Sequence, residues 1–134
     1  MPPAATIHLD PDRRVDNGLG SDQRTLSPEH YSPDWSTTRR LAESCSGALI
    51  KLAPAATIDA DPEWHRVWIS LQGSVREQSV LIGSVRHAAG LRAGGISAIA
   101  VKSDGSFDQL AGSADDDIHV ASATEIQGIM VDPD

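Results

Sequence analysis

The stretch WHRVWISL, residues 64–71, decides the fold class of this chain. Its odd-numbered positions, from His65 to Leu71, alternate with its even-numbered ones, which is the period of a β-strand whose two faces differ. Short apolar clusters bounded by Gly, Asp or Ser predict further strands at 48–53, 78–86, 96–102, 118–121 and 125–131. No helical pattern lies between these clusters, so the sequence predicts a mainly β fold, a small antiparallel β-sandwich or barrel of jelly-roll type. A parallel α/β sheet is not expected.

The composition of the chain changes near Gly47. Residues 1–46 are polar, rich in proline and arginine and short of apolar runs, whereas residues 48–131 hold almost every Val and Ile. A segment with so little apolar surface cannot build a core alone. We therefore expect two parts: an extended N-terminal arm over 1–46, lying on some other surface, and a β-sandwich domain over 47–134.

The arm contains one predicted helix, at about 33–45. Ser32-Pro33-Asp34 places a capping hydroxyl, a first-turn proline and an acid in the order that starts a helix, and Gly47 suits its end. One face of this helix presents Trp35, Thr38, Ala42 and Cys45. Residues 16–21 have turn chemistry without flanking apolar alternation, which predicts a loop and not a hairpin.

Two long connections and one recurrence stand out. Residues 88–95 are rich in glycine, and residues 103–117 form a predicted loop that contains Phe107 and Leu110. Loops of that length usually bind something or move. Residues 3–12 and 54–63 agree at seven of ten positions. This agreement indicates either chance or two short extended segments that end in similar Asp-Pro turns.

The charge balance argues against several partners. The chain has 19 acidic and 11 basic residues, for a net charge of −8, and acids outnumber bases on both sides of residue 46. We therefore expect no nucleic-acid partner and no binding to anionic lipid. Neither a signal peptide nor an apolar run of about 18 residues is evident, so we expect a soluble protein without membrane insertion. The single cysteine, Cys45, excludes an internal disulfide.

Candidate chemistry is sparse. Residues 115–117, which are three aspartates near His119, and residues 59–63 lack the ligand spacing of a calcium loop, which favours solvated loops over a metal site. No close pair occurs among the histidines, which are His8, His30, His65, His87 and His119. For His65 and His119, which lie on predicted strands, half-buried imidazoles are the favoured interpretation, and a zinc site assembled across strands is the alternative. No nucleophile elbow, phosphate loop or dinucleotide turn is present. We expect no catalytic, cofactor or metal site.

The aromatic and basic side chains predict an interaction surface. Trp64 and Trp68 point to the face opposite Val67, where the helix, the arm or a partner must cover them. A basic patch including His87 could face an Asp-rich loop of a neighbour, although scattered surface charge is the alternative. The predicted interface comprises Tyr31, Trp35, Trp64, Trp68, Arg76, Arg86, Arg92, Phe107 and Leu110.

These observations favour a non-enzymatic structural subunit, whose arm docks on other copies or on other subunits of an assembly. By analogy of plan, the setting is a virus or phage particle, in a capsid-associated, decoration or tail protein, or a cytoplasmic assembly. The first alternative is a monomeric module that binds a carbohydrate or peptide at the 103–117 loop and the tryptophan face. The second is a small metal-dependent hydrolase that uses His119, His65 and nearby aspartates.

Overall fold

The computed structural model describes residues 5–15 and 23–113. The elements in chain order are β1 (Thr6–Leu9), β2 (Arg14–Val15), β3 (Gln23–Arg24), the short 3-10 helix η1 (Pro28–His30), α1 (Trp35–Glu43), β4 (Gly47–Leu52), β5 (His65–Leu71), β6 (Ser74–Ile82), α2 (Gly83–Ala88), β7 (Gly95–Val101) and β8 (Phe107–Ser113).

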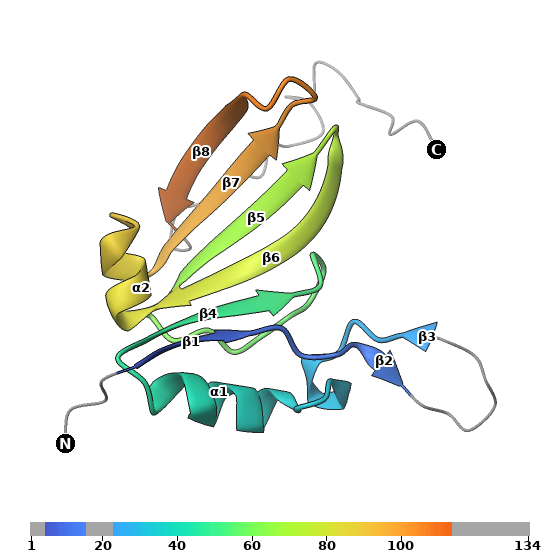
Figure 1. Cartoon of the computed structure of the whole chain (residues 1–134), viewed down its shortest axis with the longest axis vertical. Helices are drawn as coiled ribbons and strands as arrows, with labels where there is room; N and C mark the ends of the chain where they lie inside the picture. The colour runs from blue at the N-terminus through green and yellow to red at the C-terminus, as the bar shows by residue number, and fades with distance from the viewer. Residues whose placement is uncertain (1–4, 16–22, 114–134) are drawn as a thin grey trace, which may run out of the picture.

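Six of these strands form one mixed sheet in the order β1-β4-β6-β5-β7-β8 (Figure 1). The β1–β4 and β5–β7 pairs are parallel, whereas β4–β6, β6–β5 and β7–β8 are antiparallel. The prediction of a mainly β fold is thus confirmed. The predicted sandwich or barrel is not, because within the described residues these six strands make a single sheet that does not close.

The two parallel pairs arise because helices lie in the connections, α1 between β1 and β4 and α2 between β6 and β7. The sequence prediction missed α2 and extended the preceding strand to residue 86. The strand ends instead at Ile82, because Gly83 has a φ of 55° and turns the chain into α2. A Cβ at position 83 would collide with the carbonyl oxygen of Ser46, so this close approach requires glycine.

Within the described part of residues 1–46, β1 joins the six-stranded sheet and several side chains enter the main core, while β2 and β3 form a separate two-stranded sheet. β1 adds to the edge of β4, with Thr6 opposite Gly47. Tyr31 and Trp35 lie in the core, and α1 falls inside the predicted range. Its N-cap is Asp34 and not Ser32, since the Asp34 carboxylate accepts the Thr37 amide at 2.8 Å. The apolar residues of this segment that reach the core come from β1, from Tyr31 at the end of η1 and from one face of α1.

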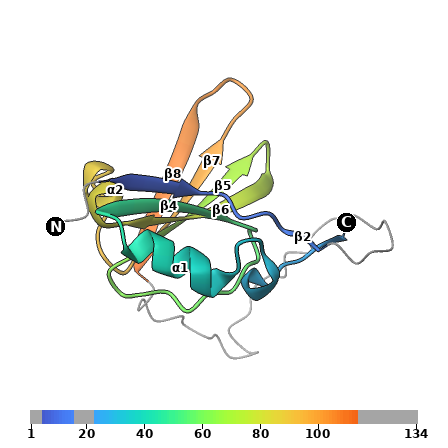
Figure 2. The same ribbon diagram turned by 60° about the horizontal axis from the view of Figure 1, so that its bottom comes forward.

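The core lies between α1 and one face of β4 and β6 (Figure 2). Ile50 is fully buried on β4, as is Val80 on β6, and burial of each such side chain stabilises the fold by about 1.5–3 kcal/mol. Trp35 packs edge-on against Trp64, with 6.0 Å between ring centroids. Residues 53–63 also pack here, where the Gln78 side-chain amide donates to the Ala56 carbonyl at 3.0 Å. We call the region of β1, β4 and β6 beneath α1 and residues 53–63 the covered half.

Three local predictions need correction or lie outside the described residues. β8 occupies residues 107–113, inside the predicted 103–117 loop, because it pairs with β7 along its whole length. β2 and β3 pair on either side of residues 16–22, where a loop alone was predicted. Residues 3–12 include β1 while 54–63 include no strand, so the two similar stretches differ in structure. The predicted strands at 118–121 and 125–131 lie outside the described residues.

Candidate interaction surface

The face of the sheet that forms the core continues beyond the core onto β5, β7 and β8. Strand pairing aligns one row of side chains across five strands, namely Leu52, Gln78, Trp68, Ala98 and Leu110. Directly paired residues point to the same face. We call this face on β5, β7 and β8 the open half. The helix α1 lies over β1 and β4 at one edge of the sheet, whereas β7 and β8 form the other edge (Figure 1).

Two adjoining hollows form a shallow apolar groove along the open half. Trp68, Ala98 and Leu110 line both hollows. One hollow, of about 380 Å³, extends to Asp108, and the other, of about 370 Å³, extends to Gly112. Leu110 is 75% exposed. Small side chains on β7 lie between the larger ones on β5 and β8, so the surface is concave and uncharged along its middle.

Trp68 is held in place by two contacts. Its indole N–H donates to the Pro54 carbonyl at 3.0 Å. The Arg66 guanidinium carbon lies 4.6 Å from the centroid of its ring, a cation–π contact. The side chain is half-buried, and these contacts fix its orientation before any partner arrives, which reduces the entropy lost on binding.

Charges of opposite sign lie near the two ends of the groove: Asp108 lines the groove itself, while Arg66 lines an adjoining hollow that shares Ile96 with it. Arg66, on β5, donates to the Gln78 side-chain oxygen at 3.0 Å, and none of the ion pairs between described residues includes it. Burial lowers the pKa of its guanidinium from the usual value, because the charged form loses hydration. Asp108 lies at the other end, 71% exposed, with its carboxylate 2.9 Å from the Lys102 amine.

The structure separates the predicted interface residues into three groups. Tyr31, Trp35 and Trp64 are 4–7% exposed in the core, so they have no surface to offer a partner in this fold. Arg86 is also buried, and its guanidinium donates to the Leu91 carbonyl at 2.8 Å. The remaining predicted residues reach the surface, and they are Trp68, Arg76, Arg92, Phe107 and Leu110.

Only Trp68 and Leu110 of the predicted set come together in the groove. Phe107 is 62% exposed but pairs with Val101, in register with Leu71, and this row points to the opposite face. Arg76 is the extra residue where the β5–β6 register shifts. Of the basic patch predicted from Arg76, Arg86, His87 and Arg92, Arg86 and His87 lie in contact on α2, with Arg86 buried, and Arg76 lies on β6.

Sequence reasoning missed Ala98 and Asp108, which line the groove, and Arg66, which lies beside it. Arg66 shares the parity of Trp68 on one strand, and this signal was available. Ala98 gave no signal, because a small residue marks a groove floor only when larger neighbours on adjacent strands are known. Asp108 fell in a segment predicted as loop.

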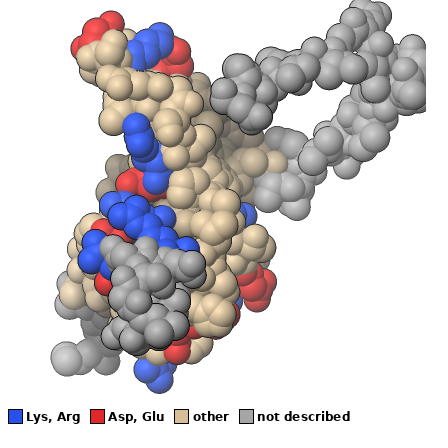
Figure 3. Space-filling view, turned by 90° about the vertical axis from the view of Figure 1, so that its right-hand side faces the viewer, with Lys and Arg blue, Asp and Glu red and all other residues tan. Residues whose placement is uncertain are grey.

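A further hollow, near β1, is polar. It lies at the side of the molecule that carries β2 and β3, where Lys and Arg side chains gather (Figure 3). Its lining includes Asp10, Asp12, Arg13, Arg14, Arg24 and Lys51. Arg14 and Arg24 are cross-strand partners, while the Lys51 amine lies 3.5 Å from the carboxylates of both Asp10 and Glu77. Charges of both signs meet here, in contrast to the apolar groove.

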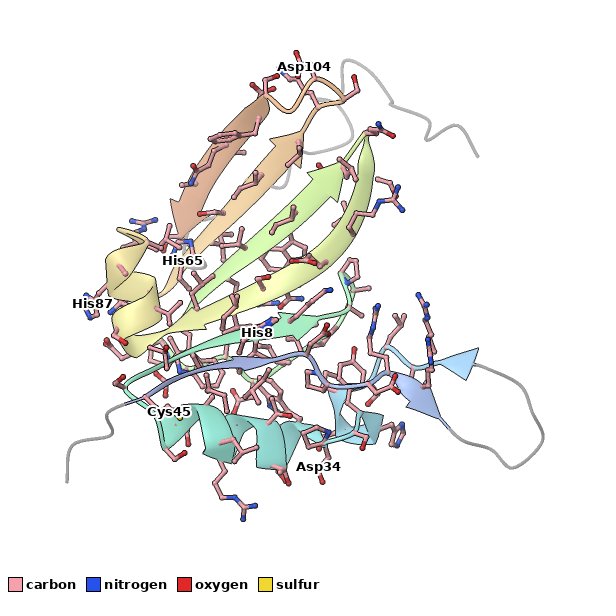
Figure 4. All side chains as sticks on the ribbon, in the orientation of Figure 1. His8, Asp34, Cys45, His65, His87 and Asp104 are labelled. Carbon is pink, nitrogen blue, oxygen red and sulfur yellow. The ribbon has the colours of Figure 1, made fainter. Side chains whose placement is uncertain are left out.

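The candidate catalytic groups do not converge in the described residues. His65 is buried, with one ring nitrogen 2.9 Å from the Arg92 carbonyl and the other 2.7 Å from the Ser97 hydroxyl. Its ring is fully paired, as expected for a structural imidazole. His8, His87 and Cys45 lie at separate places (Figure 4). Within residues 5–15 and 23–113 no three His, Cys, Asp or Glu side chains gather as a metal site would require. Residues 115–117 and His119 lie outside the described residues.

Comparisons of the chain with protein-family models, curated proteins and solved structures gave no match. In the described part of the chain, neither the length nor the apolar content of any helix suffices to cross a membrane. The groove is therefore interpreted from its own chemistry.

Proposed function

We propose that the protein is a non-enzymatic structural subunit that assembles with other copies of itself through the apolar groove of the open half. One observation carries this proposal. A single face of one sheet is buried where α1 and residues 53–63 lie over it, and the same face remains apolar and exposed on β5, β7 and β8. Stable domains bury an apolar sheet face against a second layer, and a neighbouring subunit would supply that layer.

The proposal places the contact in the open half and not in the N-terminal arm. Tyr31 and Trp35 pack within their own chain, so exchange of this arm between copies does not form part of it. A neighbour on the open half would bury Leu110 and the exposed part of Trp68, and burial of one such apolar side chain contributes about 1.5–3 kcal/mol. The setting in a virus or phage particle or in a cytoplasmic assembly stays a prediction.

A two-layer arrangement would also agree with the β-sandwich predicted from the sequence. Two sheets in a sandwich pack face to face at about 10 Å, with apolar residues of alternate positions between them. In this proposal the sandwich forms between copies. Each copy would supply its six-stranded sheet as one layer.

A second candidate function is a monomeric module that binds a peptide. The fixed Trp68 ring favours it, because a preformed aromatic wall beside a floor that includes Ala98 suits small apolar side chains of an extended chain. A carbohydrate is less favoured, because sugar stacking needs an open ring face and the Arg66 guanidinium lies over the Trp68 ring.

Sedimentation velocity over a wide range of protein concentration tests the proposed function. We expect wild-type protein to associate as concentration rises, and Leu110→Glu to weaken association by at least about tenfold. Leu26→Glu is the matched control, because Leu26 is 58% exposed outside the groove. A wild-type chain that stays monomeric throughout, or an L110E variant that associates like wild type, would overturn the proposal. Peptide binding by a monomer, lost in L110E, would support the second candidate.

A further inference from the structure

The charged residues beside the groove are arranged so that two copies of this surface are complementary to each other. Strand pairing arranges the open half in three levels along the strands. Arg66 lies at the first level with Ile96 and Gly112, and Asp108 lies at the third level with Ala100 and Ser70. The second level comprises Trp68, Ala98 and Leu110. The cation therefore lies on β5 just beyond one end of the groove, in the hollow that shares Ile96 with it, and the anion lies at the other end on β8.

We propose that the partner in the groove is a second copy of this chain, related by a two-fold axis that places Arg66 of each copy against Asp108 of the other. This inference rests on the proposed function and adds the symmetry, the residue pair and the stoichiometry. A two-fold axis parallel to the face exchanges the ends of the groove, so each charge meets its opposite. Such an isologous contact closes on itself and gives a dimer, not a filament.

The position of the axis follows from the register. β7 lies between β5 and β8, and the second level lies between the first and the third. The midpoint between Arg66 and Asp108 therefore falls on Ala98, whose side chain is exposed. Each Ala98 faces its equivalent across the axis, and two alanines allow the sheets to approach closely. Trp68 and Leu110 pack on either side of this point.

Charge complementarity supports a second copy as the occupant. Arg66 is half-buried, its Nε atom bonds only to the neutral Gln78 amide, and no carboxylate of the described residues pairs with it. A buried charge is tolerated best when paired and hydrogen-bonded. Asp108 presents an exposed carboxylate on the same surface. The net charge of −8 repels copies at long range, but salt screens that repulsion beyond about 10 Å at 0.1 M, and the middle of the groove is uncharged.

Charge exchange between subunits tests the pairing. Arg66→Asp and Asp108→Arg should each dimerise at least about tenfold more weakly than wild type, because each homodimer juxtaposes like charges. An equimolar mixture of the two variants should recover dimerisation as a heterodimer, since the side chains that R66D and D108R introduce meet at one end and the native Arg66–Asp108 pair remains at the other. Arg76→Asp and Glu63→Arg are the matched controls, as both residues are exposed outside the groove, and they should dimerise like wild type.

A second measurement does not depend on the folding of the Arg66 variant. In a Cys45→Ser background, Ala98→Cys should form an intersubunit disulfide on mild oxidation, whereas Leu26→Cys should not. Circular dichroism melts check that each variant is folded.

The outcomes separate this inference from the proposed function. Wild-type association that L110E abolishes, combined with a charge-swapped mixture that stays monomeric and no A98C crosslink, overturns the two-fold pairing and leaves the structural subunit standing. A wild-type chain that stays monomeric overturns both the proposed function and the two-fold pairing. This holds whether the groove is then occupied by residues 114–134 of the same chain or by a peptide. Species larger than a dimer overturn the closed symmetry.

Discussion

Leu52 on the covered half is 2% exposed, whereas Leu110 on the open half is 75% exposed, although one cross-strand row joins them. The two residues have the same chemistry, the same face and the same level along their strands. What separates them is the presence of α1 and residues 53–63 over one half only. The apolar face of this sheet therefore extends beyond the part that α1 and residues 53–63 cover.

The largest expected effect comes from making the same substitution at both ends of this row. Leu52→Ala should lower the free energy of unfolding by about 2–5 kcal/mol, because it leaves a cavity in the core. Leu110→Ala should change it by less than about 0.5 kcal/mol, since solvent already surrounds that side chain. Denaturant unfolding at a concentration where the protein is monomeric measures both. Equal losses would contradict the division into halves.

The next largest loss of stability is expected from replacing either of two glycines with alanine. Gly83 and Gly73 have φ values of 55° and 79°, yet only at Gly83 would a Cβ meet the Ser46 carbonyl oxygen. Gly73→Ala should cost about 1–2 kcal/mol, from the left-handed backbone alone. Gly83→Ala should cost about 2–4 kcal/mol, because overpacking adds to that penalty. Thermal unfolding of the two variants compares them, and a Gly73 loss equal to that at Gly83 would show that the close approach has no energetic weight.

A smaller effect is expected from the buried amide that joins residues 53–63 to the sheet. Gln78→Leu removes the donor to the Ala56 carbonyl and the acceptor of the Arg66 Nε–H, and should destabilise the fold by about 1–3 kcal/mol. Gln109→Leu is the control, because Gln109 is exposed on β8. Hydrogen exchange should report faster opening of 53–63 in the Gln78 variant. If hydrogen exchange of residues 53–63 is unchanged in the Gln78 variant, the Gln78 contact does not hold this segment in place.

The smallest effect concerns the start of α1. The Thr37 amide, with the Ser36 hydroxyl, donates to the Asp34 carboxylate and lowers its pKa. A lowered folded-state pKa contributes stability above the unfolded value of about 3.9, and this stability is lost as pH falls through the folded pKa. Asp34→Asn keeps a capping oxygen without the titration, so its stability should fall less steeply in acid. Parallel acid profiles for the two proteins would exclude this carboxylate as a source of the pH dependence.

The sequence predicted what depends on local periodicity. The alternation in WHRVWISL located β5 and the shared face of Trp64 and Trp68, and the capping signals located α1. The different surroundings of Trp64 and Trp68 could not be predicted. Trp64 packs against Trp35 from a helix far away in the sequence, whereas Trp68 contacts Pro54 and Arg66.

Long-range pairing explains most of the differences. The parallel β1–β4 pair joins residues about forty positions apart, and no local pattern encodes it. β8 lacks β-branched residues and becomes a strand through its pairing with β7. Arg66 is charged, yet its place beside Trp68 half-buries it. The groove, which consists of side chains from β5, β6, β7 and β8, depends on all of these pairings.

The uneven placement of the three tryptophans has a practical consequence. Trp35 and Trp64 are in contact in the interior, while Trp68 forms the groove wall next to a guanidinium. The intrinsic fluorescence of this protein should therefore contain two separable signals, one from Trp35 and Trp64 and one from Trp68. The interior pair signals whether the chain is folded, and the wavelength and quenching of Trp68 signal whether its groove is occupied, without any added label.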